Sequence, residues 1–260
     1  MRISQNLVKF GMKLSNLPII KRFFLKLFDP KNATVTSIPL NISLGTFENQ
    51  VLPLKVTEYF INKASYIFLM NYCPCRKDND CKEYKRSIGC TFIGKGVLRI
   101  KIPPERGHLA TKEEAFEREH LAYENGLVPM LGKLGADSWI MGALPDEGHF
   151  MTLCHCCPCC CHLDTIKYAT KSIRNIFRRM EGITVNVNRT VCFGCGKCLE
   201  VCIFDGMKIV DRKAIVDQDK CLGCGRCERK CPNGAITIKI DDSSCIDELI
   251  ARFEAYVDVT

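Results

Sequence analysis

The sequence predicts an α+β protein with a Cys-rich N-terminal α/β domain and a smaller C-terminal unit that contains a duplicated segment. The duplication is visible in the spacing C-x2-C-x2-C-x3-C, which occurs twice with an offset of 29 residues. Its members are Cys192, Cys195, Cys198 and Cys202, then Cys221, Cys224, Cys227 and Cys231. In the N-terminal part, short apolar runs and amphipathic helical patterns lead into cysteine-rich loops, which indicates mixed secondary structure.

The spacing of these eight cysteines fits iron–sulfur chemistry. An iron–sulfur cubane needs four converging thiolates, and three thiolates placed three residues apart can surround it from one loop. Glycines in the gaps allow tight turns and direct backbone N–H groups at sulfur; they are Gly194, Gly196, Gly223 and Gly225. The alternatives are two four-cysteine zinc sites or a disulfide framework, but zinc sites usually use two separated C-x-x-C pairs.

Residues 184–240 resemble the bacterial-type two-[4Fe-4S] ferredoxin domain, which makes the expected C-terminal fold a ferredoxin-like duplicated, dicluster one. The resemblance implies that the fourth cysteine of each run serves the other cluster. One cluster would then be held by Cys192, Cys195, Cys198 and Cys231, and the other by Cys221, Cys224, Cys227 and Cys202. Ile203 departs from the family, which usually has proline there, and this puts the local turn geometry in doubt.

Composition places the chain among globular proteins of a reducing compartment. It has 260 residues, 47% of them apolar and 25% charged, which allows one or two domains with a real core. Its 19 cysteines are odd in number, and no secretory signal is visible, so we expect metal-bound thiolates in the cytoplasm. The formal charge of +8 would be offset by bound clusters, and no nucleic-acid-binding module is present, so nucleic acid is not an expected partner.

Residues 1–53 form a basic amphipathic N-terminal segment. In residues 1–31, apolar residues recur every three or four positions among many lysines and arginines, and Gly11 and Pro18 divide the pattern into two short helices. Two interpretations stay open: peripheral membrane contact through residues 1–31, or helices packed on the body of the protein. Alternation over residues 34–44 predicts one strand.

Residues 54–182 form the predicted Cys-rich domain. A helix over 54–65 and a buried strand over 66–70 lead into C-x-C-x5-C-x8-C, formed by Cys73, Cys75, Cys81 and Cys90. These four thiolates predict a third metal centre held by one loop, either a third Fe–S cluster or a structural zinc ion. Nearby arginines and lysines could balance its negative charge.

A helix over 111–125 carries a capping box of Thr111 and Glu114 and is followed by Gly126. His120 on this helix is either a ligand or a hydrogen-bonded core residue. Residues 126–149 are rich in Gly and Pro, contain Trp139, and are expected to form a long irregular segment.

A second apolar run, 150–153, leads into the richest cysteine segment of the chain. Six cysteines and two histidines occupy nine positions: Cys154, His155, Cys156, Cys157, Cys159, Cys160, Cys161 and His162. Neighbouring cysteines cannot all point the same way, so only part of the set is expected to bind one centre. Cys73 and Cys75 could share a site with this run, and a redox-active thiol set or a metal store is an alternative.

Residues 72–161 are similar to a domain fused to ferredoxins in anaerobic microbes, with a Cys-x-Cys-Arg element and a later Cys-Cys-x-Cys-Cys element. That family is described as iron–sulfur proteins, and the similarity implies no reaction. A helix over 163–180 and a boundary at Glu181-Gly182 follow. In the unit 183–240 we expect strands over 184–188 and 235–240 and a hairpin over 208–216. The last segment, 241–260, is a helix capped by Ser243 or Ser244, with Cys245 as a packed thiol.

These features predict an iron–sulfur electron-transfer protein that relays single low-potential electrons through two [4Fe-4S] clusters to or from the N-terminal cysteines and redox partner proteins. The alternative is an oxidoreductase whose N-terminal Cys-rich centre is the active site. The chain has no P-loop and no dinucleotide-binding G-x-G-x-x-G, so nucleotide and flavin chemistry is not indicated.

Overall fold

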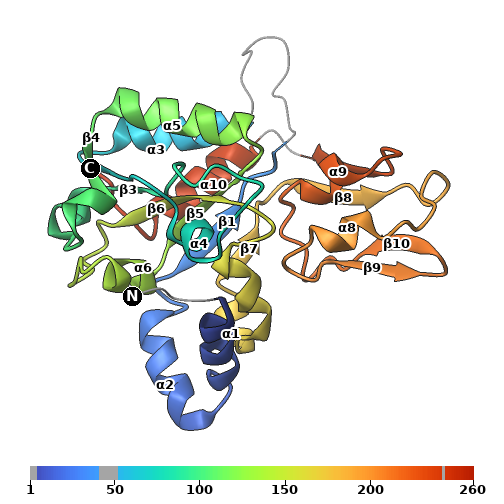
Figure 1. The fold of residues 1–260 in the computed structure, drawn as a ribbon, viewed down its shortest axis with the longest axis horizontal. Helices are drawn as coiled ribbons and strands as arrows, with labels where there is room; N and C mark the ends of the chain where they lie inside the picture. Colours follow the sequence, from blue (N-terminus) through green and yellow to red (C-terminus); the bar gives the residue numbers. More distant parts are fainter. Residues whose placement is uncertain (1–4, 41–51, 242–243) are drawn as a thin grey trace.

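The computed structural model describes residues 5–40, 52–241 and 244–260, and it contains a large sheet domain with a smaller α+β unit beside it (Figure 1). The large sheet has seven strands in the order β4-β2-β3-β6-β5-β1-β7. In that order the strands are β4 (Gly107–Ala110), β2 (Ile67–Met70), β3 (Thr91–Ile93), β6 (Met151–Cys156), β5 (Val128–Lys133), β1 (Thr34–Ser37) and β7 (Phe177–Arg179).

The sheet is almost entirely antiparallel, which corrects the expectation of an α/β domain. Among the strands in the described ranges, only β1 and β7 run parallel, with Val35 opposite Phe177. The strand predicted within 34–44 is β1; residues 41–44 lie outside the described part. Strand β5 corrects the expected irregular segment 126–149, because it pairs with both β6 and β1 despite Pro129 and Gly132. The single helix expected over 163–180 is likewise corrected, because this stretch forms a 3-10 helix, a four-residue α-helix and strand β7.

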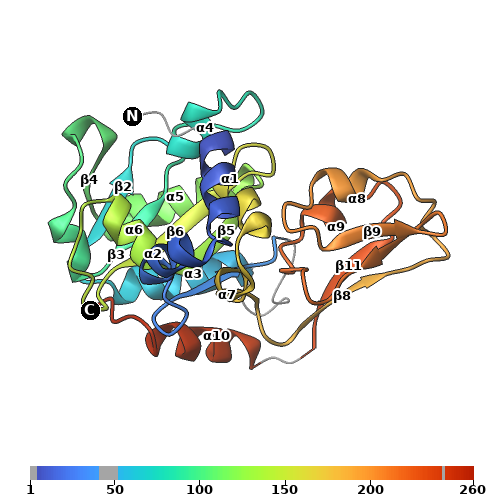
Figure 2. The same ribbon diagram turned by 90° about the horizontal axis from the view of Figure 1, so that it is seen from below.

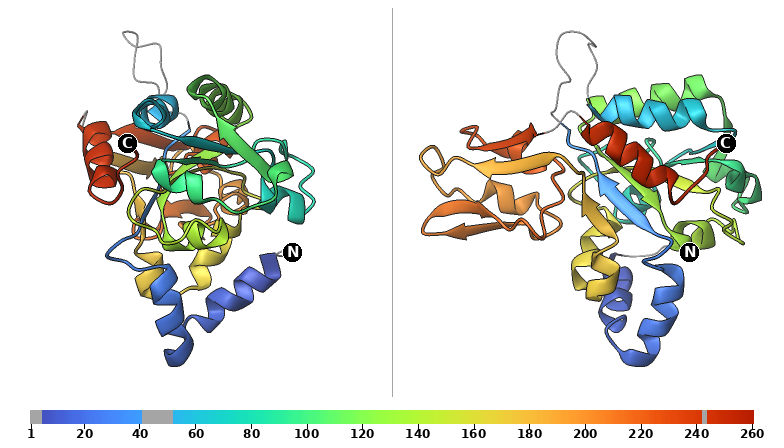
Figure 3. Two further views of the ribbon diagram at one scale, coloured as in Figure 1. Left: turned by 90° about the vertical axis from the view of Figure 1, so that its left-hand side faces the viewer. Right: turned by 180° about the vertical axis from the view of Figure 1, so that it is seen from behind.

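Three helices cover one face of the sheet: α3 (Leu52–Lys63), α5 (Lys112–Glu124) and α10 (Cys245–Glu254) (Figure 3). Phe60 of α3 and Phe253 of α10 pack edge to face, with ring centroids 6.1 Å apart, in a core that also takes Leu131 and Leu153 from the sheet. The capping box predicted for α5 is present, since Thr111 Oγ1 accepts from Glu114 N and Glu114 accepts from Thr111 N.

The opposite face of the sheet carries shorter elements. They are α1 (Gln5–Leu14), α2 (Pro18–Leu27), α4 (Pro74–Asp78), α6 (Gly135–Ile140), α7 (Lys171–Arg174), and the 3-10 helices η1 (Lys95–Arg99), η2 (Pro104–Arg106) and η3 (His162–Tyr168). The two short helices predicted in residues 1–31 are α1 and α2. Met12 of α1 is buried, and Lys9 lies over the ring of Tyr168 in η3, so α1 packs on the body of the protein. Some apolar residues of α1 and α2 nevertheless face outward. In the described ranges no helix is both long and apolar enough to cross a membrane.

The smaller unit contains two antiparallel strand pairs and two short helices. Strand β8 (Ile183–Val187) pairs with β11 (Ile236–Ile240), and β9 (Met207–Val210) pairs with β10 (Lys213–Val216), as the sequence predicts. Helices α8 (Lys197–Glu200) and α9 (Arg226–Lys230) lie near each other on one side (Figure 2). Each helix follows a glycine in the left-handed region, Gly196 or Gly225.

The two parts of the molecule share a packed junction. Ser37 Oγ at the end of β1 donates to Leu222 O at 2.6 Å, and Leu222 is buried with Ile203 and Phe204 in a core formed largely by the N-terminal domain. Isoleucine at position 203, where proline was expected from the resemblance, therefore has a structural reason, because this side chain is buried at the junction.

Candidate iron–sulfur centres and metal site

Two groups of four cysteines in the smaller unit each line one cavity. The outer quartet surrounds a cavity also lined by Ile209 and Ile236; it consists of Cys192, Cys195, Cys198 and Cys231. The inner quartet lines a second cavity next to Leu222 and Arg226; it consists of Cys202, Cys221, Cys224 and Cys227. The structure thus brings together the same two sets that the resemblance implies, with the fourth cysteine of each run on the opposite cavity.

Backbone geometry around the quartets directs N–H groups at sulfur. Ala214 N donates to Cys192 Sγ at 3.3 Å, Gly206 N to Cys202 Sγ at 3.2 Å, and Ala235 N to Cys231 Sγ at 3.3 Å. The donation from Ala214 lowers the pKa of the Cys192 thiol. Such hydrogen bonds stabilise a thiolate, which is the form that binds metal.

Glycine is required in these loops. Gly194 has a φ of +78°, and a Cβ there would collide with the carbonyl oxygen of Arg212. Gly225 has a φ of +83°, and its Cβ would lie 3.0 Å from Leu40 N at the junction of the two parts. These positions hold tight turns and close backbone approaches that a side chain would prevent.

The inner quartet fits an anionic cluster. Burial raises the pKa of the thiols of Cys221 and Cys227, so their thiolates need a positive centre to be stable. Arg226 is 6% exposed and lines the same cavity, and in the described part of the chain its Nε and Nη1 have no hydrogen-bond partner. Acceptor sulfurs of a [4Fe-4S] cluster would satisfy these donors, which are otherwise costly to bury.

The N-terminal domain contains a cavity of about 570 Å³ on the face of the sheet opposite α3 and α5. Its wall includes Met70, Phe92 and Met141 and the polar residues Arg106 and His162. We call seven further residues of this wall the cavity cysteines: Cys73, Cys75, Cys90, Cys154, Cys156, Cys157 and Cys161. Strand β6 contributes two of them because Cys154 and Cys156 alternate with His155 and share one face of the sheet.

Several cavity cysteines are in direct contact. Cys90 Sγ and Cys154 Sγ lie 3.1 Å apart, as do Cys156 Sγ and Cys161 Sγ. Hydrogen bonds from Cys154 and Cys161 hold the pKa of Cys156 well below its usual range, while the same contacts and burial raise those of Cys154 and Cys161. Such a set of sulfurs is suited to a metal centre or to redox chemistry.

A buried arginine connects the two cysteine loops at this cavity. Arg76 is 1% exposed and donates from Nε to Lys85 O at 3.0 Å, from Nη1 to His155 O at 2.7 Å, and from Nη2 to Ile88 O. Burial by itself lowers the pKa of the guanidinium. Electrostatic attraction to Cys73, Cys157 and Cys90 outweighs this effect and raises the pKa overall. A buried cation of this kind favours negative charge at the cysteines.

His155 links β6 to α5. Its Nε2 lies 2.8 Å from Glu119 Oε1 and its Nδ1 lies 3.0 Å from Gly89 O, both in the buried interior. Although burial lowers it, the attraction of Glu119 raises the pKa of His155 overall. Two acceptors on the two ring nitrogens favour the imidazolium, which is a donor at both. His155, held at both ring nitrogens, therefore positions the cysteines on either side of it, and it is itself one of the residues that line the cavity.

The four cysteines predicted to share one loop site are separated by the fold. Cys73, Cys75 and Cys90 are cavity cysteines, whereas Cys81 lies with cysteines of the later segment. The Cys81 quartet has sulfurs within 4.8 Å of one another and consists of Cys81, Cys157, Cys159 and Cys160. The structure therefore does not bring these four sulfurs together, because α4 turns the chain before Cys81. Cys73 and Cys75 instead line one cavity with cysteines of the later run, which is the alternative that the sequence left open.

Other residues singled out in the sequence have different positions. His120 is exposed and lies 3.2 Å from Glu58, away from the cysteines. Trp139 is exposed on α6, while Asp137 of the same helix lines the cavity. Cys245 is the first residue of α10 and is buried in the core.

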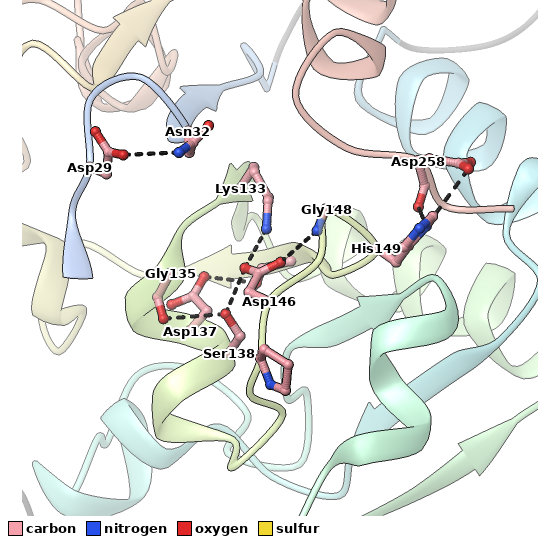
Figure 4. Close-up of polar contacts among 12 residues, drawn as sticks. Asp29, Asn32, Lys133, Gly135, Asp137, Ser138, Asp146, Gly148, His149 and Asp258 are labelled. Carbon is pink, nitrogen blue, oxygen red and sulfur yellow. Dashed lines mark hydrogen bonds and ion pairs between the residues drawn. The ribbon is translucent and has the colours of Figure 1, made fainter. Parts of the chain in front are cut away.

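A polar network fixes α6 at the edge of the cavity (Figure 4). Asp146 accepts from Lys133 Nζ, from Ser138 Oγ at 2.7 Å and from Gly148 N at 3.1 Å. Asp137 accepts from Thr152 Oγ1 at 2.7 Å, and burial raises its pKa to about 6. The cavity therefore has a carboxylate on a wall that is otherwise mostly sulfur and apolar groups.

Comparison with protein families matches residues 214–237 to the Fer4 family, described as a 4Fe-4S binding domain. The match covers most of β10, the second cysteine run and the start of β11. A comparison with curated proteins finds no match. Together with the cysteine groups, the family match shows an iron–sulfur protein of α+β fold with further sites suited to metal binding.

Proposed function

We propose that this protein transfers single electrons between an external redox partner and the cysteine-lined cavity of its N-terminal domain, through two [4Fe-4S] clusters in the outer and inner quartets. A [4Fe-4S] cluster held by four thiolates accepts and donates one electron at a potential tuned by hydrogen bonds, charge and exposure. We place the protein in a reducing cytoplasm, where its thiols stay available for metal.

The contact between the inner quartet and the cavity carries the proposal. Arg226, which directly precedes Cys227, donates from Nη2 to Cys156 O at 2.9 Å. Its charge also lowers the pKa of Cys156. One side chain therefore lies against the inner quartet and the cavity cysteines together, so the two sites are neighbours in a buried, low-dielectric junction.

The outer quartet supports an entry point for electrons. Cys195 is exposed, and Phe193 beside it is 57% exposed. Val191 and Leu199 also have exposed side chains in the same run. An apolar rim around a solvent-accessible sulfur is a surface on which a redox partner could dock at short distance.

Anaerobic iron and acid-labile sulfide analysis tests the cofactor part of this proposal. Two cubanes give about eight irons and eight sulfides per chain, and iron in the cavity raises the number. Electron paramagnetic resonance of dithionite-reduced protein should retain the signals of the paired clusters when Cys154, Cys156 and Cys161 are replaced by serine. Colourless protein without sulfide would contradict the proposal.

The cavity itself favours a second candidate function, an oxidoreductase with its active site at the cavity cysteines. A site that only relays electrons needs no open space, whereas about 570 Å³ is the size of a small-molecule pocket. Arg106 and Lys77 could bind an anionic substrate, and Asp137 could supply a proton. A disulfide is one fitting substrate class: two electrons and two protons convert it to two thiols.

Turnover separates the two candidates. Dithionite-reduced protein would be mixed with a small organic disulfide, and thiol release measured for wild type, Cys90→Ser and Cys245→Ser. Catalytic release that is lost in Cys90→Ser and retained in Cys245→Ser supports the enzyme. Oxidation by a single equivalent, without turnover, supports electron transfer alone.

We also propose that α1 and α2 contact an anionic membrane surface. Ile19 is 89% exposed, and Phe10 and Phe23 are exposed as well, next to the basic residues Lys21 and Arg22. A basic amphipathic surface binds anionic lipid through both features. We expect the protein to bind vesicles that contain anionic lipid and not to bind zwitterionic vesicles, and we expect Ile19→Ser to lose this binding. Equal binding to the two kinds of vesicle would contradict the proposal.

A further inference from the structure

The Cys81 quartet differs from the other cysteine groups in its dimensions. Its four sulfurs lie within 4.8 Å of one another, and Cys81 Sγ is 3.6 Å from Cys159 Sγ. A zinc ion with Zn–S bonds of about 2.3 Å in a tetrahedron places its sulfurs about 3.8 Å apart. In a cubane each thiolate binds a different iron, so the sulfurs lie farther apart; the ferredoxin-unit quartets, also within the described residues, do not meet the 4.8 Å limit.

The surroundings of the quartet fit a closed site. Ile88, Ala122 and Leu127 are buried around it, and of its four cysteines only Cys159 is exposed. Backbone amides of Tyr84 and Glu83 donate to Cys81 Sγ. Such N–H···S bonds orient ligands in metal–thiolate sites. Four thiolates complete a tetrahedron and leave no position for substrate.

The quartet also has a compensating charge. Four thiolates around one divalent ion leave a net charge of about −2. The buried guanidinium of Arg76 donates to the carbonyl oxygen of Ile88, and Ile88 packs against cysteines of the quartet. The positive charge of this arginine therefore lies close enough to offset part of the negative charge of the quartet, while its hydrogen bonds go to backbone carbonyls.

We propose that Cys81, Cys157, Cys159 and Cys160 bind one tetrahedral zinc ion without sulfide, as a structural site separate from the iron–sulfur centres. The ion would join the loop after α4 to the turn after β6. These two loops follow α4 and β6, which carry the cavity residues Cys75 and Cys156, so the ion would fix the shape of the cavity wall. Cys157 borders both the ion and the cavity.

Zinc-edge X-ray absorption of the full-length, anaerobically purified protein tests this without any substitution. We expect about one zinc per chain with four sulfur neighbours at about 2.3 Å. The assignment would be overturned if protein produced with both zinc and iron supplied contained no zinc. It would also be overturned if the zinc had nitrogen or oxygen ligands, or if iron occupied this position. This readout does not depend on electron transfer, so its failure would leave the proposed function in place.

A pair of variants locates the ion. Cys159→Ser changes the exposed ligand, and Cys245→Ser changes a buried cysteine in α10 that belongs to none of the sites. Zinc content should fall roughly tenfold or more in Cys159→Ser, with iron and sulfide unchanged, and stay at the wild-type value in Cys245→Ser. Loss of about four irons and four sulfides in Cys159→Ser would show a cluster instead. Unchanged zinc in Cys159→Ser would also overturn the proposal.

Discussion

Replacing Arg76 by methionine should strongly destabilise the N-terminal domain. The side chain donates to three carbonyl oxygens, those of Lys85, Ile88 and His155, which belong to the first cysteine loop and to β6. Each buried carbonyl that loses a charged donor costs about 1–3 kcal/mol. Because methionine fills much of the volume but satisfies none of them, we expect a loss of about 3–6 kcal/mol.

The assay is thermal unfolding of the anaerobically purified protein. A change of 1 kcal/mol moves the midpoint of a domain of this size by about 2–4 °C, so Arg76→Met should lower it by about 6–24 °C. The unfolding midpoint of Arg76→Lys should lie between those of the wild type and Arg76→Met. A lysine keeps the charge but lacks the planar fork that reaches all three oxygens. The control is Arg99→Met, whose exposed ion pair with Glu147 should contribute less than about 1 kcal/mol. Equal shifts for Arg76→Met and Arg99→Met would refute the reasoning.

Three further results are expected. Arg226→Gln should make the potential of the inner cluster about 0.1 V more negative in a redox titration, since one charge at about 6 Å contributes about 3 kcal/mol at an effective dielectric constant of 20; an unchanged potential would argue against a role for this charge. Cys202→Ser should disturb the signal of the cluster held by the second run, and Cys231→Ser that of the first; the reverse pattern would exclude the crossed assignment. Because Glu119 raises the pKa of His155 above its unfolded value, the stability from this pair should be complete below pH 6.5 and decline as pH rises through the folded pKa, and His155→Gln should remove the dependence in unfolding measured from pH 6 to 9. Parallel pH profiles for wild type and His155→Gln would show that another group is responsible.

Local signals in the sequence predict much of this fold. The capping box of Thr111 and Glu114 marks the start of α5, and the glycines between the cysteines mark the turns of the smaller unit. In each case the information lies within a few residues, where side-chain and backbone chemistry act directly. The crossed grouping of the eight cysteines in the smaller unit is different, because it is implied by the resemblance to two-cluster ferredoxins and not by the spacing itself.

Long-range features could not be predicted from local patterns. Pro129 and Gly132 disfavour a strand, yet β5 forms because β1 and β6 pair with it on both sides. Cys81 joins cysteines more than seventy positions later because the sheet places two loops together, and no spacing rule contains that information. Arg226 carries no motif at all; its role appears only where the junction places it against Cys156.

The smaller unit is an insertion in the larger one. The chain leaves the main sheet after β7, forms β8 to β11, and returns as α10, where Tyr59 and Lys63 of α3 both contact Glu254. Two attachments restrict tumbling far more than a single flexible tether would. Electron exchange between the halves should therefore be a first-order process whose rate is unaffected by dilution, and only the encounter with an outside donor or acceptor should depend on concentration.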